Sequence, residues 1–349
     1  MKQKHYIGFI TLVAATLLAA CVHDYPTMTP DGEEGIDPTL VVIDTEVTFD
    51  LDLEPFGSIT NKNRSGATEA ATDDHRRRFI IEARRNGRAE VRQVAVIEDA
   101  EETGKTLTLP VRLRLHAVEY SLTVWTDYVQ SGTDTDLHYN TGDLNSVGLN
   151  EPYAGNTDYR DCHYATVPLD LRPYRDQWNA RVRLDVDMVR PLAKYRIVAT
   201  DVEQYKRLIH SKGYPPLNEL SATVLYEGFL PNSFNVTTGS PNDATTGLSY
   251  EGVLPDIAAE DSHVQVGSDL ILANGAETFT NVTVRITDNA GNTVSRVSGV
   301  RIPYRRGHLT TITGKFLTAG TTGGNIHVDT EWEDDIICLL YTSPSPRDS

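Results

Sequence analysis

Residues 107–128 read Leu-Thr-Leu-Pro-Val-Arg-Leu-Arg-Leu-His-Ala-Val-Glu-Tyr-Ser-Leu-Thr-Val-Trp-Thr-Asp-Tyr, and apolar side chains occupy nearly every second position. The first run extends from Leu107 to Leu115, and the second extends from Tyr120 to Tyr128 after a short turn. Successive side chains of a β-strand point to opposite faces, so a period of two predicts one dry and one wet face. The stretch therefore predicts two strands joined by a turn.

The same alternation recurs in residues 47–53, 182–188 and 282–286. Antiparallel strands with one dry face bury that face when two sheets stack, which gives a β-sandwich. We therefore expect an all-β protein built from antiparallel sandwiches.

A single segment favours a helix. Within residues 201–211, four apolar side chains fall on one helical face, and they are Val202, Tyr205, Leu208 and Ile209. Asp201 is the expected N-cap and Gly213 follows the expected end. One isolated helix is not part of a series of alternating strands and helices, so a parallel sheet wrapped by helices is not predicted.

The composition excludes several classes of protein. The chain has 349 residues, of which 39% are hydrophobic, so it can bury a core and is not a disordered chain. Its formal net charge of −17 makes nucleic acid a poor partner, because phosphates require clustered cations. No apolar run reaches the roughly 18 residues of a membrane span. Three cysteines exclude a disulfide scaffold.

The N-terminus has the pattern of an export signal. Lys2 and Lys4 precede the apolar stretch 7–20, and Leu18-Ala-Ala-Cys21 resembles the bacterial lipobox, whose cysteine receives a diacylglyceryl group. The alternative is an ordinary cleaved signal peptide with a cysteine there by chance. We expect a signal peptide at 1–20, lipidation of Cys21, and a tether at 21–39, because that acidic, proline-bearing segment has no periodicity.

The C-terminal residues 338–349 continue neither the pattern nor the composition before them, so we interpret them as translated sequencing-adapter sequence. A genuine disordered tail is the alternative. Pro168 and Pro173 interrupt the strand pattern, and two domains of about 150 residues fit the remaining length. We expect an N-terminal domain at 40–173 and a C-terminal domain at 174–337.

The polar stretch 61–88 carries two runs of arginine, Arg76–Arg78 and Arg84–Arg85. It is interpreted as a long hairpin connection or a protease-accessible loop. The arginines are interpreted as solvated cations of a turn or as part of the protease-accessible loop.

Motifs of catalysis are missing from the sequence: it has no nucleophile elbow, phosphate-binding loop, zinc-protease motif or paired-cysteine zinc spacing. We therefore predict no enzyme, no cofactor and no metal site. Cys162 is interpreted as a small core residue, with a nucleophile as the alternative. Asp134, Asp136, Asp143 and Asn140 supply hard oxygen ligands that could suit Ca²⁺, but a solvated acidic loop is the other interpretation.

Aromatic residues are frequent between positions 120 and 160. They are Trp125, Tyr128, Tyr139, Tyr153 and Tyr159. A platform on which sugars stack is one interpretation, and the core and rim of a sandwich is the other.

Several segments together resemble FimB-type minor fimbrial subunits. They are Cys21-Val-His-Asp-Tyr-Pro26, Val124-Trp-Thr-Asp-Tyr-Val129, His138-Tyr-Asn-Thr141, Lys194-Tyr-Arg-Ile-Val-Ala-Thr200, Pro303-Tyr-Arg-Arg-Gly-His-Leu-Thr-Thr-Ile-Thr-Gly-Lys-Phe-Leu-Thr318 and Val328-Asp-Thr-Glu-Trp-Glu-Asp-Asp-Ile336. The resemblance covers nearly the whole chain after the signal peptide, and its motifs are signatures of a fold, not of catalysis.

The resemblance implies two tandem transthyretin-like antiparallel β-sandwich domains with one short helix in the second. It also implies an outer-membrane lipoprotein, palmitate-bearing at Cys21, that anchors or assists type V fimbriae of Bacteroides-type bacteria. Its partners would be other fimbrial subunits, joined by addition of a β-strand to an open sheet edge. The alternative function is a glycan-binding surface lipoprotein, and a host or bacterial surface ligand is left open.

Overall fold

The structure is a computed structural model that describes residues 41–52, 56, 74–97, 106–177, 180–256, 258, 260–319 and 326–330. The expected signal peptide at 1–20, lipidated Cys21, tether at 21–39 and adapter segment at 338–349 lie outside the described residues.

The fold is all-β, as predicted, and its first two sheets form a sandwich. One sheet has the order β4 (Thr106–His116), β1 (Val42–Asp52), β9 (Arg181–Met188). The other has the order β3 (Arg88–Ile97), β2 (His75–Arg85), β5 (Glu119–Gln130), β8 (His163–Asp170). The rings of Phe49 on β1 and Phe79 on β2 stack with their centroids 6.0 Å apart. The alternating residues of β1 therefore place their apolar side chains between the sheets, as a period of two requires.

Strand β2 contradicts both interpretations for residues 75–85, whereas residues 61–73 of the polar stretch lie outside the described residues. Residues 75–85 form a strand that pairs with β3 on one side and β5 on the other. Arg77, Arg78 and Arg84 are all buried within it, so they are neither solvated turn cations nor an exposed protease site. The pattern of apolar residues did not predict this strand, because arginines occupy buried positions where apolar residues are expected. Ion pairs with Asp127 and Glu82 compensate the charges of Arg78 and Arg84 there.

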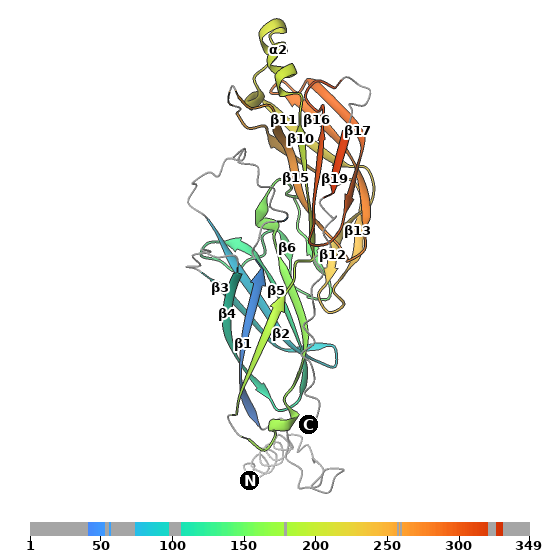
Figure 1. Ribbon diagram of the computed structural model, residues 1–349. Helices are drawn as coiled ribbons and strands as arrows, with labels where there is room; N and C mark the ends of the chain where they lie inside the picture. The colour runs from blue at the N-terminus through green and yellow to red at the C-terminus, as the bar shows by residue number, and fades with distance from the viewer. Residues whose placement is uncertain are drawn as a thin grey trace, which may run out of the picture. The chain divides into compact units, whose positions relative to one another are not determined.

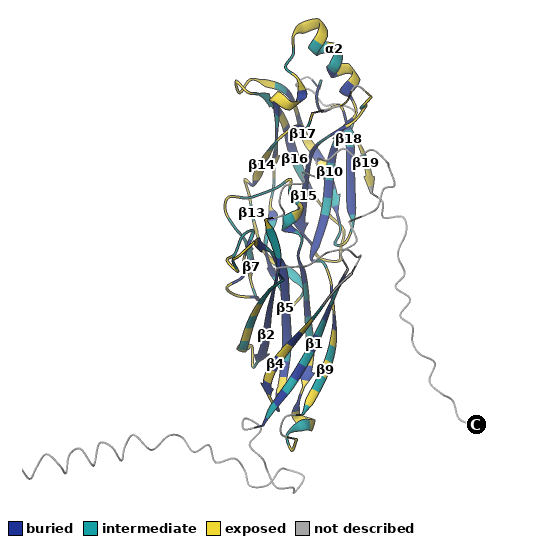
Figure 2. Ribbon diagram, turned by 90° about the vertical axis from the view of Figure 1, so that its left-hand side faces the viewer, coloured by how far each residue is buried: buried dark blue, intermediate teal, exposed yellow. Residues whose placement is uncertain are grey.

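Two further sheets form the second sandwich. One has the order β15 (Val264–Leu272), β10 (Leu192–Ala199), β18 (Leu309–Gly314), β19 (Ile326–Thr330). The other has the order β14 (Ser249–Val253), β11 (Leu220–Tyr226), β16 (Thr278–Asp288), β17 (Thr293–Tyr304). Figure 2 shows the buried residues concentrated along β10, β15 and β18. The hydroxyls of Tyr195 on β10 and Tyr226 on β11 lie 2.8 Å apart, so the inner faces of these two sheets are in contact.

One pair of neighbouring strands in the second sandwich is parallel. Strands β10 and β18 run parallel, with Lys194 opposite Leu309 and Ala199 opposite Gly314. A parallel pair needs a crossover between its strands, and the long segment from β11 to β17 supplies it here.

A small fifth sheet has the order β13 (Ser240–Thr245), β12 (Leu230–Asn235), β7 (Val147–Leu149), β6 (Tyr139–Asn140). Its β7–β12 pair joins segments from either side of residue 173 through Ser233 opposite Gly148 and Phe234 opposite Val147. Three short 3-10 helices complete the elements: η1 (Asp158–Arg160), η2 (Arg172–Tyr174) and η3 (Leu217–Glu219). The domain boundary at 173/174 stays a prediction.

Helix α2 (Val202–Lys212) lies where the sequence predicted a helix, beyond the ends of β10 and β11 in Figure 1. Gly213 ends it in a left-handed conformation with φ of 67°, which glycine adopts at no steric cost. Asp201 occupies the N-cap position, but its side chain does not cap the helix. Its carboxylate instead accepts hydrogen bonds from the backbone of Leu317 and from the backbone and hydroxyl of Thr318.

By contacts, the described residues form two compact units. The smaller consists of residues 41–46, 112–119 and 170–183, and backbone hydrogen bonds from Asp44 to Ala180 and from Ala117 to Val41 hold it together. The larger contains the remaining described residues and all the side chains discussed below as candidate sites. Among the described residues, no helix has the length and apolar character needed to span a membrane.

Candidate functional site

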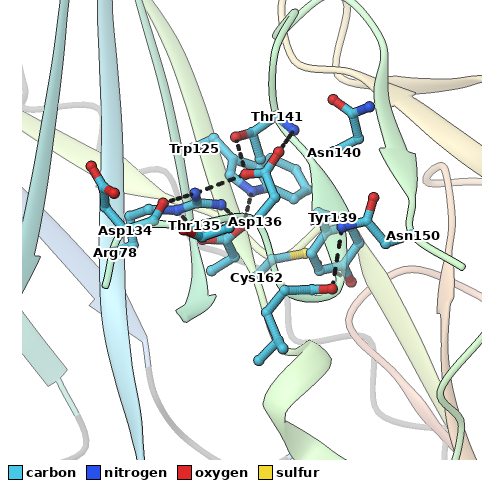
Figure 3. A network of polar contacts seen from close by, with 12 residues as sticks. Arg78, Trp125, Asp134, Thr135, Asp136, Tyr139, Asn140, Thr141, Asn150 and Cys162 are labelled. Atoms are coloured by element: carbon cyan, nitrogen blue, oxygen red, sulfur yellow. Dashed lines mark hydrogen bonds and ion pairs between the residues drawn. The ribbon is translucent and has the colours of Figure 1, made fainter. Parts of the chain in front are cut away.

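The aromatic segment surrounds a buried arginine. Arg78 donates from Nε and Nη2 to the two carboxylate oxygens of Asp127, at 2.9 and 2.7 Å. Its Nη1 donates to the backbone oxygen of Asp134 at 2.7 Å and to Asp136 Oδ1 at 2.8 Å. Trp125 Nε1 donates to Asp127 as well, at 3.2 Å. Figure 3 shows Asp134 and Asp136 beside the side chain of Arg78.

The candidate calcium ligands are engaged with the protein itself. Asp136 accepts hydrogen bonds from the backbone and hydroxyl of Thr141, at 2.9 and 2.7 Å, in addition to those from Arg78. Asp143 and Asn140 each accept from a backbone N–H two residues further on. Burial opposes the change, but the hydrogen bonds from Thr141 and Arg78 outweigh it and lower the pKa of Asp136. The carboxylate of Asp136 thus binds a cation of the chain, and the side-chain oxygens of Asp143 and Asn140 bind the backbone. No described cluster of three His, Cys, Asp or Glu residues could hold a metal ion.

Two of the five aromatic side chains in the predicted sugar-stacking platform are buried and cannot contact a sugar. Trp125 and Tyr139 have no exposed surface, and they pack edge to face with centroids 5.3 Å apart. Tyr159 is half-buried, and its ring stacks on His75 at 3.6 Å. The core-and-rim interpretation therefore describes this segment, because a buried indole offers no face to a sugar.

Cys162 also belongs to the core. It is fully buried beside Tyr139, whose hydroxyl lies 3.6 Å from its sulfur. Burial raises the pKa of the Cys162 thiol well above its usual range. A thiol of this kind stays protonated, so the interpretation as a core residue fits and the nucleophile does not.

A second polar network was not predicted from the sequence. Arg160 on η1 donates to Asp269 Oδ1 on β15 at 2.6 Å, with both side chains at most 2% exposed. Tyr153 and Tyr226 donate to Asp269 Oδ2 at 2.5 and 2.7 Å. Burial raises the pKa values of Tyr153 and Tyr226, so their hydroxyls remain protonated donors. No spacing pattern connects residues 109 positions apart, so the sequence carried no signal for this pair.

The sheet edges bear on the predicted mode of association. In the described part of the chain, each sheet has two edge strands that pair on one side only: β4 and β9, β3 and β8, β15 and β19, β14 and β17, β13 and β6. An edge strand presents backbone N–H and C=O groups that can pair with a strand from another chain. Strand β14 carries an exposed apolar side chain at its C-terminal end, because Val253 is 69% exposed.

Comparison with solved structures finds several similar proteins at low sequence identity. A DUF1812 protein from Bacteroides thetaiotaomicron is similar over 83% of this chain and 99% of its own, with 12% identity and a TM-score of 0.44. The fimbrial anchor protein Mfa2 from Porphyromonas gingivalis is similar over 78% of this chain and 90% of its own, with 12% identity and a TM-score of 0.40. A fimbrial assembly protein from Parabacteroides distasonis is similar over 83% of this chain and 96% of its own, with 11% identity and a TM-score of 0.37.

The sequence comparison is more specific. The family of unknown function DUF6562 matches residues 38–344, and this chain belongs to that family. No curated protein sequence matches the chain.

Proposed function

We propose that this chain is a non-enzymatic, lipid-anchored protein of the bacterial outer membrane and an anchor or accessory subunit of fimbriae of the FimB type. The observation that carries the proposal is the position of the segments that resemble such subunits. Val124–Val129 lies in β5, Lys194–Thr200 covers most of β10, and Pro303–Thr318 contains β18. Strand β5 is an interior strand of a sheet in the first sandwich, and β10 and β18 are interior strands of a sheet in the second. The resemblance therefore concerns the framework of the sandwiches.

A fourth resembling segment builds the loop around Arg78. His138–Thr141 contains Thr141, which binds Asp136, and Tyr139, which packs on Trp125. The same segments thus supply both the sheets and the polar contacts that hold them. A framework shared in this way supports a common mode of assembly.

The partners in this proposal are other fimbrial subunits, joined through a strand added at an edge. Hydrogen exchange of the full chain, with and without a purified fimbrial subunit, tests this. Amides of one of the edge strands should gain protection, since a new ladder closes them to water. Protection confined to side-chain surfaces away from every edge would contradict strand addition.

Deletion of the encoding gene tests the fimbrial role itself. Fimbrial length or attachment to the cell should change in the source organism. Fimbriae of unaltered length and attachment would refute the proposal.

Lipidation at Cys21 is tested by replacing the residue. Cys21→Ser should release the protein from the membrane fraction, because each buried methylene of an acyl chain contributes about 0.8 kcal/mol to anchoring. Cys162→Ala is the control, because it removes a thiol that is buried in the fold and should leave the protein in the membrane fraction. Membrane retention of Cys21→Ser would contradict the anchor.

The alternative, a glycan-binding lipoprotein that uses the aromatic segment, loses its main support. It required an exposed ring at Trp125, and that side chain is fully buried.

A further inference from the structure

The outer face of the sheet β14-β11-β16-β17 carries a polar hollow of about 390 Å³. Its floor includes the hydroxyl side chains of Ser221, Thr223 and Thr287. Glu251 and Arg285 stand at its sides, and the turn that begins at Asp288 closes one end.

The strand register fixes this arrangement. Thr223 on β11 lies opposite Glu251 on β14 and opposite Arg285 on β16, so these three residues form a row across the sheet. In the next row, Ser221 lies opposite Thr287. Strands lie about 4.8 Å apart, so the backbones of Glu251 and Arg285 are separated by about 10 Å. Short hydroxyl side chains between two long charged ones produce the hollow.

The side chains at its two sides are free to bind a ligand. Glu251 and Arg285 are exposed, and within the part of the chain that the structure describes neither makes a hydrogen bond or an ion pair. The carboxylate of Asp288 is in a different situation. It accepts from the backbone of Ala290 and from the backbone and side chain of Asn292, at 2.8 to 3.0 Å. These bonds fix the turn and lower the pKa of Asp288.

We propose that this hollow binds a sugar acid, meaning a monosaccharide or glycan end that carries a carboxylate. The planar guanidinium of Arg285 matches a carboxylate with two parallel hydrogen bonds. The hydroxyls of Thr223 and Ser221 can donate or accept, and Glu251 accepts from sugar hydroxyl groups. Both charged side chains of the hollow and two of its hydroxyl groups then have a partner on one ligand.

The distance across the row favours this class over a free amino acid. An α-amino acid carries its ammonium and carboxylate on the same carbon, so it cannot easily reach both Glu251 and Arg285. A sugar acid carries its carboxylate and its far hydroxyl on opposite sides of a ring. A neutral sugar would leave Arg285 without an ionic partner. This inference does not depend on the fimbrial role, because binding and fimbrial assembly are measured separately.

Titration of the full chain with D-galacturonic acid, D-galactose and L-alanine, followed by ligand-observed NMR, tests the proposal. Galacturonic acid should bind with a dissociation constant in the millimolar range, and roughly tenfold more tightly than either other ligand, because only it satisfies both sides. Equal binding of galactose or alanine, or no binding of galacturonic acid, would overturn it.

Three variants and a control locate the binding. Arg285→Gln should weaken galacturonic acid binding by roughly tenfold, because it removes the two parallel hydrogen bonds to the carboxylate. Glu251→Gln should weaken binding by several-fold, because it removes the charge from one acceptor. Thr223→Leu should abolish binding, since its side chain fills the floor while both charges remain. Arg296→Gln is the matched control: Arg296 lies opposite Arg285 in the same row but does not line the hollow. Weakening in Arg296→Gln equal to that in Arg285→Gln would refute the assignment, as would undiminished binding in Thr223→Leu.

Discussion

The guanidinium of Arg160 lies 2.6 Å from the carboxylate of Asp269, and neither side chain is more than 2% exposed. Asp269 also accepts hydrogen bonds from Tyr153, Tyr226 and the backbone of Leu270. A buried charge is tolerated only when it is paired and its remaining lone pairs are satisfied, and this carboxylate meets both conditions. The ion pair fixes the short helix η1 onto strand β15.

Removing one partner of this pair should destabilise the fold strongly. Asp269→Asn keeps the volume but leaves the Arg160 charge buried without a counter-ion, which costs about 3–5 kcal/mol of unfolding free energy. Urea unfolding of the full chain measures it. Glu90→Gln is the control, since Glu90 pairs with Arg85 at 3.7 Å and both are more than a third exposed. That change should cost less than about 1 kcal/mol. Equal losses of unfolding free energy in the two variants would show that the buried ion pair contributes no more to stability than the exposed one.

The sequence revealed strands where one face is dry and the other wet, and it failed where burial is polar. The alternating residues of β1, β4, β5, β9 and β16 were all predicted as strands. Strand β2 was missed because Arg78 and Arg84 occupy buried positions that a hydrophobicity pattern assigns to solvent. The partner of Arg78, Asp127, lies on β5 and becomes evident only once β2 and β5 are paired, whereas the partner of Arg84, Glu82, lies two residues away on β2 itself.

Candidate sites were predicted less well than strands, for a related reason. Asp201 precedes a helix, and its type favours an N-cap, yet its carboxylate binds the backbone at residues 317–318. A partner more than a hundred residues away leaves no local signal. The hollow beside Thr223 is equally hidden, because it depends on the register of β14, β11 and β16.

His138 should make stability depend on pH. Burial, together with the positive charges of Arg160 and His75, lowers the pKa of His138 to about 4 from its ordinary 6.5. Between these two values the unfolded chain binds the proton and the folded chain does not, so stability falls as the pH drops from 6.5 towards 4. Because the side chain is partly exposed, the loss attributable to His138 is only about 1–2 kcal/mol.

The measurement is chemical unfolding of wild type and His138→Gln at several pH values between 4 and 7. The variant should lose this part of the pH dependence, since glutamine does not titrate. His210→Gln serves as the control, because His210 is exposed on α2 and its replacement should leave the pH profile unchanged. Identical profiles for His138→Gln and wild type would contradict the role of His138.

Gly155 should not tolerate a side chain. A Cβ added there would meet the ring of Tyr250 closer than van der Waals contact permits. Tyr250 would have to move, and its hydroxyl would lose the 3.1 Å contact with Tyr195. Gly155→Ala should therefore cost about 1–3 kcal/mol in thermal or urea unfolding. Gly228→Ala meets no atom within 4 Å and should change stability by no more than about 0.5 kcal/mol. A neutral Gly155→Ala would mean that Tyr250 has room the structure does not show.

Arg78→Lys tests whether guanidinium geometry, as opposed to charge alone, holds the loop at residues 134–141. Lysine keeps the charge but cannot reproduce the two parallel bonds to Asp127 while also reaching Asp134 and Asp136. We expect a loss of about 2–4 kcal/mol, because buried acceptors lose their partners. Hydrogen exchange at the backbone N–H of Thr141, which donates to Asp136, should be faster in Arg78→Lys than in wild type. Arg114→Lys is the matched control, because Arg114 is 76% exposed and lies 3.9 Å from Asp44. If Arg78→Lys leaves exchange at Thr141 as slow as Arg114→Lys does, positive charge alone organises the loop.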